Sequence, residues 1–185
     1  QLKFLNSAKI ESVNYDQKVL NESVADLDFI FAINAEKSGK YQIKLGQKLF
    51  PFELKKGQNL VKIPLSIPNP ILWWSNGLGV PHQYVFHFSL EQNREILDSK
   101  ELKIGLRTIE LVQEKDAFGT SFYFKLNGKS VFMKGANYIP PDSFIPKQTP
   151  SSYHETIQNA RKANMNMLRV WGGGCLLYTS DAADE

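Results

Sequence analysis

The sequence has little of what several classes of protein require. One cysteine, Cys175, stands in 185 residues, so an internal disulfide and a cysteine-based zinc cluster are excluded. The three histidines, His82, His87 and His154, are dispersed at no metal-ligand spacing. No apolar run approaches the roughly 20 residues of a membrane span. The net charge is +3, and lysine and arginine are scattered rather than clustered, which does not favour a nucleic-acid partner.

What is present is typical of a globular protein, with 42% apolar and 12% aromatic residues. The chain does not begin with methionine, and its first residues, QLKFLNSAKIESVNYD, resemble the interior of a strand-rich domain more than a signal peptide. The sequence therefore gives no localisation and no oligomeric state.

Residues 1 to about 107 carry the pattern of β-strands. In LDFIFAI (27–33) every second residue is apolar, the period of two that half-buries a strand. The same alternation recurs in YQIKL (41–45), LVKIPLSI (60–67) and YVFHFSL (84–90). Short strands at this spacing, with no helical period between them, predict a two-sheet sandwich of about 100 residues.

A different pattern begins near IGLRTIELV (104–112). Asn127-Gly128 stands between two apolar runs, which is the strongest short signal for a β-hairpin. The run VFMKGANYI (131–139) then predicts a strand that ends at Pro140-Pro141, because proline cannot continue a ladder of hydrogen bonds.

A helix is predicted after these prolines. Thr149 is a candidate N-cap, Pro150 suits the first turn, and Ser152 with Glu155 would form a capping box. One helical face carries Tyr153, Ile157, Ala160 and Ala163. The apolar segment MLRVW (167–171) follows as a strand, so the order is strand, helix, strand. We expect the two strands to be parallel neighbours that open an α/β domain.

The candidate binding residues follow the carboxyl ends of these two strands, where ligands collect in parallel α/β architectures. Asn137, Tyr138 and Asp142 lie at or beyond the first end, and Arg169 and Trp171 at the second. An arginine on an otherwise apolar, buried strand needs an anionic partner. A tryptophan followed by three glycines offers an aromatic face suited to a flat ligand such as a sugar ring.

Each of these residues also has a structural interpretation. Trp171 is equally suited to fill the core at the end of its strand, and Arg169 to pair with a nearby carboxylate. Asn137 and Asp142 are common turn residues. The glycines after Trp171 lack the spacing and the lysine of a phosphate loop. The pair Trp73-Trp74 is expected to form a packed corner between strands rather than a binding platform.

Taken together, the motifs resemble glycoside hydrolase family 2, and within it the β-mannosidases. The similar stretches, in the family's order, are NPILWWSNGLGVPHQYVFHFSL (69–90), KIGLRTIELVQ (103–113), FKLNGKSVFMKGANYIPPDSF (124–144) and ARKANMNMLRVWGGG (160–174). Ser75 replaces the usual proline, Gln83 the usual leucine, and Tyr138 the commoner tryptophan. The tryptophan after Arg-Val, with its three glycines, favours the mannosidases over the galactosidase and glucuronidase branches.

The resemblance covers residues 1–174 and implies a mostly β fold in two parts. Residues 1–107 correspond to an immunoglobulin-like β-sandwich. Residues 108–174 correspond to the first β-α-β piece of a TIM (β/α)8 barrel, the catalytic domain of the family. The chain is thus expected to be a fragment that lacks the rest of that barrel and the domain that precedes the sandwich.

The activity implied is that of a retaining exo-hydrolase that removes terminal, non-reducing β-linked mannose from an oligosaccharide or glycan, without a cofactor or a metal. Retention needs two carboxylates about 5–5.5 Å apart, and in the family both are glutamates beyond residue 174, so no catalytic residue is expected in this chain. The resemblance places Trp171 in the mannose subsite and Arg169 beneath the catalytic carboxylates, where its charge helps to keep the nucleophile ionised. Asn137 is a further substrate-binding candidate.

Two other interpretations stay open. The chain could belong to a related activity of the same family, such as an exo-β-glucosaminidase, because the sandwich and the entry to the barrel are shared. Alternatively it is a non-catalytic immunoglobulin-like module for carbohydrate binding or domain packing. A free-standing sandwich has no reason to carry KGANYIPPDSF and LRVWGGG, which favours the enzyme.

The end of the sequence does not follow the family. After residue 174 the chain continues as CLLYTSDAADE, which resembles the conceptual translation of a transposase sequencing adapter. We expect residues 175–185 to be read-through from library construction and exclude them from the predicted fold.

Overall fold

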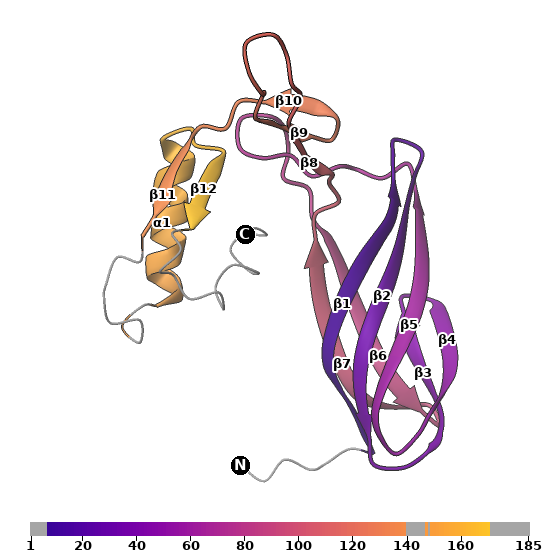
Figure 1. The fold of residues 1–185 in the computed structure, drawn as a ribbon. Coiled ribbons are helices and arrows are strands. Elements are labelled where there is room, and N and C mark those ends of the chain that lie inside the picture. The colour runs from indigo at the N-terminus through magenta and orange to yellow at the C-terminus, as the bar shows by residue number, and fades with distance from the viewer. Residues whose placement is uncertain (1–6, 140–146, 148, 171–185) are drawn as a thin grey trace. The chain divides into compact units, whose positions relative to one another are not determined.

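The computed structural model describes residues 7–139, 147 and 149–170. It divides the chain into two compact units (Figure 1). Unit 1 comprises Gln1–Pro70 and Tyr84–Ile104, and unit 2 comprises Ile71–Gln83 and Gly105–Glu185. Three predictions concern residues outside the described ranges: the roles of Trp171 and Asp142 and the nature of segment 175–185.

Unit 1 is a β-sandwich of two antiparallel sheets, as predicted (Figure 1). The first sheet has the order β1-β2-β5, with β1 (Ala8–Leu20), β2 (Val24–Ala35) and β5 (Gly57–Pro68). The second has the order β4-β3-β6-β7, with β3 (Gly39–Leu45), β4 (Lys48–Leu54), β6 (Tyr84–Gln92) and β7 (Glu95–Ile104).

The core of the sandwich comes from the alternating pattern of β2. Leu27, Phe29, Phe31 and Ile33 are each at most 1% exposed, so the predicted buried face is confirmed. The Phe88 ring from the opposite sheet meets the rings of Phe29 and Phe31 edge-on, with centroids 4.9 and 5.0 Å apart, a favourable geometry for aromatic pairs.

Unit 2 begins its main segment with a three-stranded antiparallel sheet in the order β10-β9-β8 (Figure 1). Its strands are β8 (Ile109–Val112), β9 (Tyr123–Leu126) and β10 (Lys129–Val131). The predicted hairpin joins β9 to β10, and both turn residues have positive φ, 50° at Asn127 and 75° at Gly128. These are the conformations for which the Asn-Gly pair is selected.

The prediction of one continuous strand over residues 131–139 is wrong. β10 ends at Val131, and a separate strand, β11 (Gly135–Tyr138), pairs in another sheet. The reason is Asn166, whose side chain accepts a hydrogen bond from Lys134 N (2.8 Å) and donates one to Phe132 O (3.1 Å). Between the two strands, these backbone N–H and C=O groups therefore bond to a side chain instead of to a neighbouring strand.

The segment that follows is the predicted strand, helix and parallel strand: β11, α1 (Pro150–Lys162) and β12 (Met167–Val170). Thr149 is the N-cap, as predicted, but the capping box joins Thr149 to Ser152 rather than Ser152 to Glu155. Because Thr149 itself is the N-cap, the residue at position N3, which completes the capping box, is Ser152. Of the predicted helical face, Ala163 lies just past the helix and is exposed. Within the described residues, no helix is long and apolar enough to cross a membrane.

Candidate functional site

The candidate site lies on the parallel pair β11–β12. The two strands pair in the register Gly135↔Met167, Ala136↔Leu168, Asn137↔Arg169 and Tyr138↔Val170. In a parallel pair, residues in register project from the same face of the sheet. The predicted site residues Asn137 and Arg169 are therefore side by side at the carboxyl ends of adjacent strands.

The two faces of this pair differ. The Tyr138 ring lies 6.4 Å from the Tyr153 ring of α1, so α1 covers the face from which Tyr138 projects. Asn137 and Arg169 project from the opposite face, and both are exposed. Arg169 Nη1 donates a hydrogen bond to Asn137 Oδ1 across 3.3 Å. The structure thus joins two of the three predicted substrate-binding residues, while the third, Trp171, lies outside the described residues.

The burial predicted for Arg169 needs a correction. The sequence predicts a buried strand, whereas the guanidinium is exposed and bonded to the amide oxygen of Asn137. No ion pair of Arg169 occurs among the described residues. An exposed guanidinium stays hydrated and needs no counter-charge to be stable, so an anionic partner of Arg169 stays a prediction.

Sequence reasoning missed Gly135, which allows the two strands to pair. A Cβ built on Gly135 would overlap the carbonyl oxygen of Met167 and lie 2.8 Å from its carbonyl carbon. Only glycine fits such an approach of two backbones. An isolated glycine within an otherwise apolar strand pattern is the signal that could have indicated it.

Sequence reasoning also missed Asn166, which connects the start of β12 to the residues before β11. Besides its two side-chain bonds, its backbone N–H donates to Lys134 O across 2.8 Å. The signal for a turn here was Asn164, which has a φ of 56° just after α1, since asparagine is common in the left-handed position that ends a helix.

The chemistry of this arrangement is recognition rather than bond cleavage. A guanidinium and an amide on an open face donate hydrogen bonds to hydroxyl or carboxylate oxygens. Tyr138 belongs to the other face, where burial raises the pKa of its phenol and the neighbouring Tyr153 adds to the effect. Among the described residues, no group of histidine, cysteine, aspartate or glutamate could hold a metal ion.

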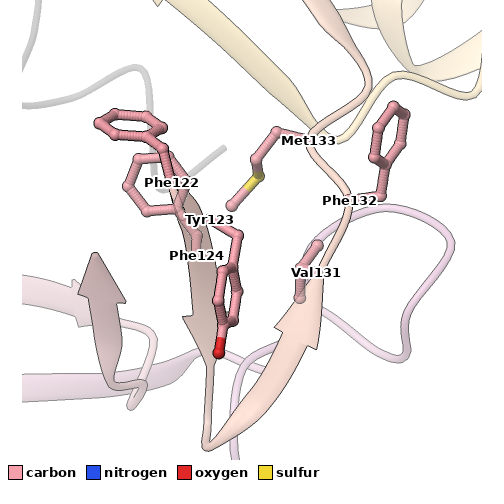
Figure 2. Close-up of a pocket in the computed structure, with 6 residues that line it drawn as sticks. All are labelled: Phe122, Tyr123, Phe124, Val131, Phe132 and Met133. Carbon is pink, nitrogen blue, oxygen red and sulfur yellow. The ribbon is translucent and has the colours of Figure 1, made fainter. Parts of the chain in front are cut away.

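A second concave region lies on the antiparallel sheet of the same unit. This hollow of about 220 Å³ is lined by Phe122, Tyr123, Phe124, Val131, Phe132 and Met133. Figure 2 shows that these side chains come from the start of β9 with the residue before it, and from the end of β10 with the two residues that follow. Its lining carries no charged group, so it lacks the convergent polar groups by which a sugar would be oriented.

Comparison with known proteins gives the family. The model of glycosyl hydrolases family 2 matches residues 6–107, which is more than half of the chain. The chain belongs to glycosyl hydrolase family 2. β-Mannosidase B of Aspergillus flavus is 40% identical to it over 123 residues, covering 66% of this chain and 14% of that protein. β-Mannosidase B of Aspergillus oryzae is 31% identical over 174 residues, covering 94% of this chain and 20% of that protein.

Solved structures of similar proteins agree with the fold. The crystal structure of β-D-mannosidase from Dictyoglomus thermophilum is 35% identical, with a TM-score of 0.82 over 93% of this chain and 22% of that one. The exo-chitosanase CsxA of Amycolatopsis orientalis has a TM-score of 0.78 over 96% of this chain and 21% of that one at 20% identity, and shows the fold alone. The family 2 chain thus spans roughly a seventh to a fifth of the length of these relatives.

Proposed function

We propose that this chain is part of a retaining exo-β-mannosidase that hydrolyses terminal, non-reducing β-D-mannose residues of β-mannosides. The observation that carries the proposal is the Asn137–Arg169 pair, which stands on the open face of two parallel strands at their carboxyl ends. The β-mannosidases of fungi and mammals that match over 63–96% of the chain at 29–40% identity support the choice of sugar.

Residues 108–174 are, in this proposal, the start of the catalytic (β/α)8 barrel. In such a barrel each parallel strand is covered by a helix on its outer face, and its inner face lines the interior. β11 and β12 have α1 on one face, at Tyr138, and leave the other exposed at Asn137 and Arg169. The open face therefore corresponds to the barrel interior, and the strands' carboxyl ends to the side on which active sites of these barrels lie.

The roles follow from charge and geometry. The Arg169 guanidinium stabilises the ionised form of a nearby carboxylate, which lowers that carboxyl's pKa and keeps a nucleophile reactive. Asn137 limits the rotamers of Arg169 through the 3.3 Å bond, and Trp171 offers a face for the sugar ring. The two catalytic carboxylates are supplied by later strands of the barrel.

Two observations separate this proposal from its alternatives. A free-standing immunoglobulin-like module would not need the parallel β11–α1–β12 segment. An exo-β-glucosaminidase shares the fold, but the glucosaminidase structures are 20% identical to this chain, against 35% for the mannosidase structure.

The test compares this chain with a longer gene product that includes the later strands of the barrel. We expect no release of p-nitrophenol from p-nitrophenyl β-D-mannoside by the 185-residue chain above the buffer rate. The longer product is expected to hydrolyse it faster than the β-D-glucosaminide, and to lose activity when Arg169→Ala, but not the exposed Arg94→Ala, is introduced. Turnover by the 185-residue chain, or a preference of the longer product for the glucosaminide, would contradict the proposal.

A further inference from the structure

We infer that Asn76 is a positioning residue for the Asn137–Arg169 pair. The loop Ile71–Gln83 lies between β5 and β6 of unit 1 in the sequence, yet it belongs to unit 2. Its tryptophans are fixed beside the β8–β10 sheet, and its asparagine holds the turn that leads from α1 into β12. The inference rests on the proposed function only in that Arg169 is taken to face a sugar.

Trp73 fixes the first part of this loop. Its backbone N–H donates to Leu106 O across 2.8 Å, and its carbonyl accepts a hydrogen bond from Asn127 Nδ2 across 2.9 Å. The guanidinium of Arg107 lies 4.6 Å from the centre of the indole ring, within the range of a cation–π interaction. A Cβ on Gly105 would lie 2.7 Å from the same ring, so the ring packs directly on the backbone.

Trp74 fixes the return of the loop. Its N–H donates to Val80 O across 3.2 Å, and a Cβ on Gly79 would lie 2.8 Å from its ring. The Lys129 ammonium lies 5.1 Å from the ring centre on the side of the β9–β10 hairpin. The pair Trp73-Trp74 thus forms the packed corner that the sequence predicts, with backbone and side-chain contacts on both rings.

The turn between the tryptophans and Gly79 presents Asn76. Leu78 N donates to Ser75 O across 3.0 Å, and Gly77 has a φ of 80°, a conformation that a residue with a Cβ rarely adopts. Asn76 occupies the second position of this turn. Its location is therefore set by the corner on one side and by the glycine turn on the other.

The Asn76 amide uses both of its N–H groups on the end of α1. Nδ2 donates to Arg161 O across 3.1 Å and to Met165 O across 3.0 Å. Arg161 O, in the last turn of α1, also accepts a hydrogen bond from Asn164 N across 3.0 Å, and Met165 follows the helix. The two carbonyls bracket the left-handed residue Asn164, where the chain leaves α1. A planar amide bonded to both carbonyls fixes the direction in which the chain leaves α1.

β12 begins two residues after Met165. The direction in which the chain leaves α1 therefore sets the position at which β12 starts. Asn166 attaches the same point to the residues before β11, and the Asn137↔Arg169 register follows from these two attachments. A slip of one residue would turn Arg169 toward the face that α1 covers. Asn76 thereby determines, through α1 and β12, which side of the sheet receives the guanidinium.

The test uses Asn76→Asp in the 185-residue chain, with amide hydrogen exchange followed by NMR. Aspartate has the same shape, but its carboxylate cannot donate and it repels both carbonyls. We expect protection of the amides of Met167–Val170 to fall by about tenfold or more, while protection in β2 is unchanged. Below the carboxyl's ordinary pKa of about 4, the protonated acid regains a donor, and part of the protection returns.

Two further variants complete the design. Asn93→Asp adds the same charge at an exposed position of the β6–β7 turn and is expected to change nothing at Met167–Val170 at any pH. Asn76→Ala is expected to lower protection there without the recovery at low pH. Unaltered protection in Asn76→Asp, a loss without recovery in acid, or no measurable protection at β12 in the unsubstituted chain would each overturn the inference. None of these readouts depends on mannoside hydrolysis, so the inference and the proposed function can fail separately.

Discussion

The replacement Gly135→Ala tests whether the site depends on the close approach of β11 to β12. The added Cβ would overlap the Met167 carbonyl oxygen and lie 2.8 Å from its carbonyl carbon. Non-bonded carbon atoms prefer about 3.5–4.0 Å, so the strands must move apart by about 1 Å. Because the overlap is with backbone atoms, no side-chain rotation can relieve it.

The magnitude follows from the hydrogen bonds at risk. A separation of this size weakens two or three bonds of a ladder with four registered pairs, at about 1 kcal/mol each. Alanine returns about 0.5–1 kcal/mol through its smaller backbone entropy in the unfolded chain. We therefore expect unit 2 to lose about 1–2.5 kcal/mol, within the range of about 1–3 kcal/mol for overpacking.

The assay uses the distribution of tryptophans. The sequence of unit 1 contains no tryptophan, whereas Trp73 and Trp74 belong to unit 2. Tryptophan emission during urea unfolding therefore reports unit 2, whereas far-ultraviolet circular dichroism is dominated by the strands of the sandwich. With a slope of about 1–1.5 kcal/mol per M for a small unit, the emission midpoint is expected to fall by roughly 0.7–2.5 M. The midpoint from dichroism should not change.

The control is Gly39→Ala, at the start of β3. Its nearest atom would be the flexible amide end of Gln92, at 3.2 Å, so a change within about 0.5 kcal/mol is expected. If Gly135→Ala leaves the emission midpoint where it is, the close approach does not constrain the strand pair, and the reasoning about the site is refuted.

Three other changes test different parts of the molecule. Phe29→Ala is expected to cost the sandwich about 3–5 kcal/mol, since the ring is fully buried, while Leu60→Ala, 80% exposed, costs less than about 0.5 kcal/mol by dichroism-monitored unfolding. Asn166→Ala should lower the emission midpoint of unit 2 by the equivalent of about 1–3 kcal/mol, because two backbone groups lose their partner; an unchanged midpoint would contradict this. Tyr138→Phe removes a buried hydroxyl with no hydrogen-bond partner among the described residues and should leave unit 2 equally stable or up to about 1 kcal/mol more stable. Burial raises the pKa of this phenol in the folded chain, so the neutral phenol contributes stability below its ordinary pKa of about 10. This contribution is lost as the pH rises through the raised pKa. The loss of stability at alkaline pH should therefore be smaller in Tyr138→Phe than in the unsubstituted chain.

The fold was predictable where the determining interactions are local. The period of two in β2, the Asn127-Gly128 turn and the Thr149 cap each depend on neighbours within four residues along the chain, and each is confirmed. The site pair was predictable for a related reason. Parallel strands that flank one helix bring their carboxyl ends together, and this places Asn137 beside Arg169 without knowledge of any other contact.

The rest could not be predicted because its partners are distant in sequence. Asn76 bonds a carbonyl 85 residues away, and Asn166 interrupts a strand 34 residues before it. An asparagine in a loop gives no indication of which backbone groups it will satisfy. The burial of Arg169 was predicted wrongly because the pattern of MLRVW does not show that one face of the strand is left open.

The balance of burial explains why single hydrogen bonds should matter more in unit 2 than in the sandwich. In the described part of unit 2, the buried apolar side chains are those of Leu106, Leu126 and Val131, and α1 contributes none. Phe118 and Phe132 of the same unit are 100% and 82% exposed. At about 25 cal/mol per Å² of apolar area removed from water, so small a core leaves little free energy to offset a lost polar contact. The orientation of Arg169 therefore depends on Gly135, Asn76 and Asn166 in unit 2, whereas the sandwich, with its continuous aromatic core, should tolerate equivalent changes at its polar positions.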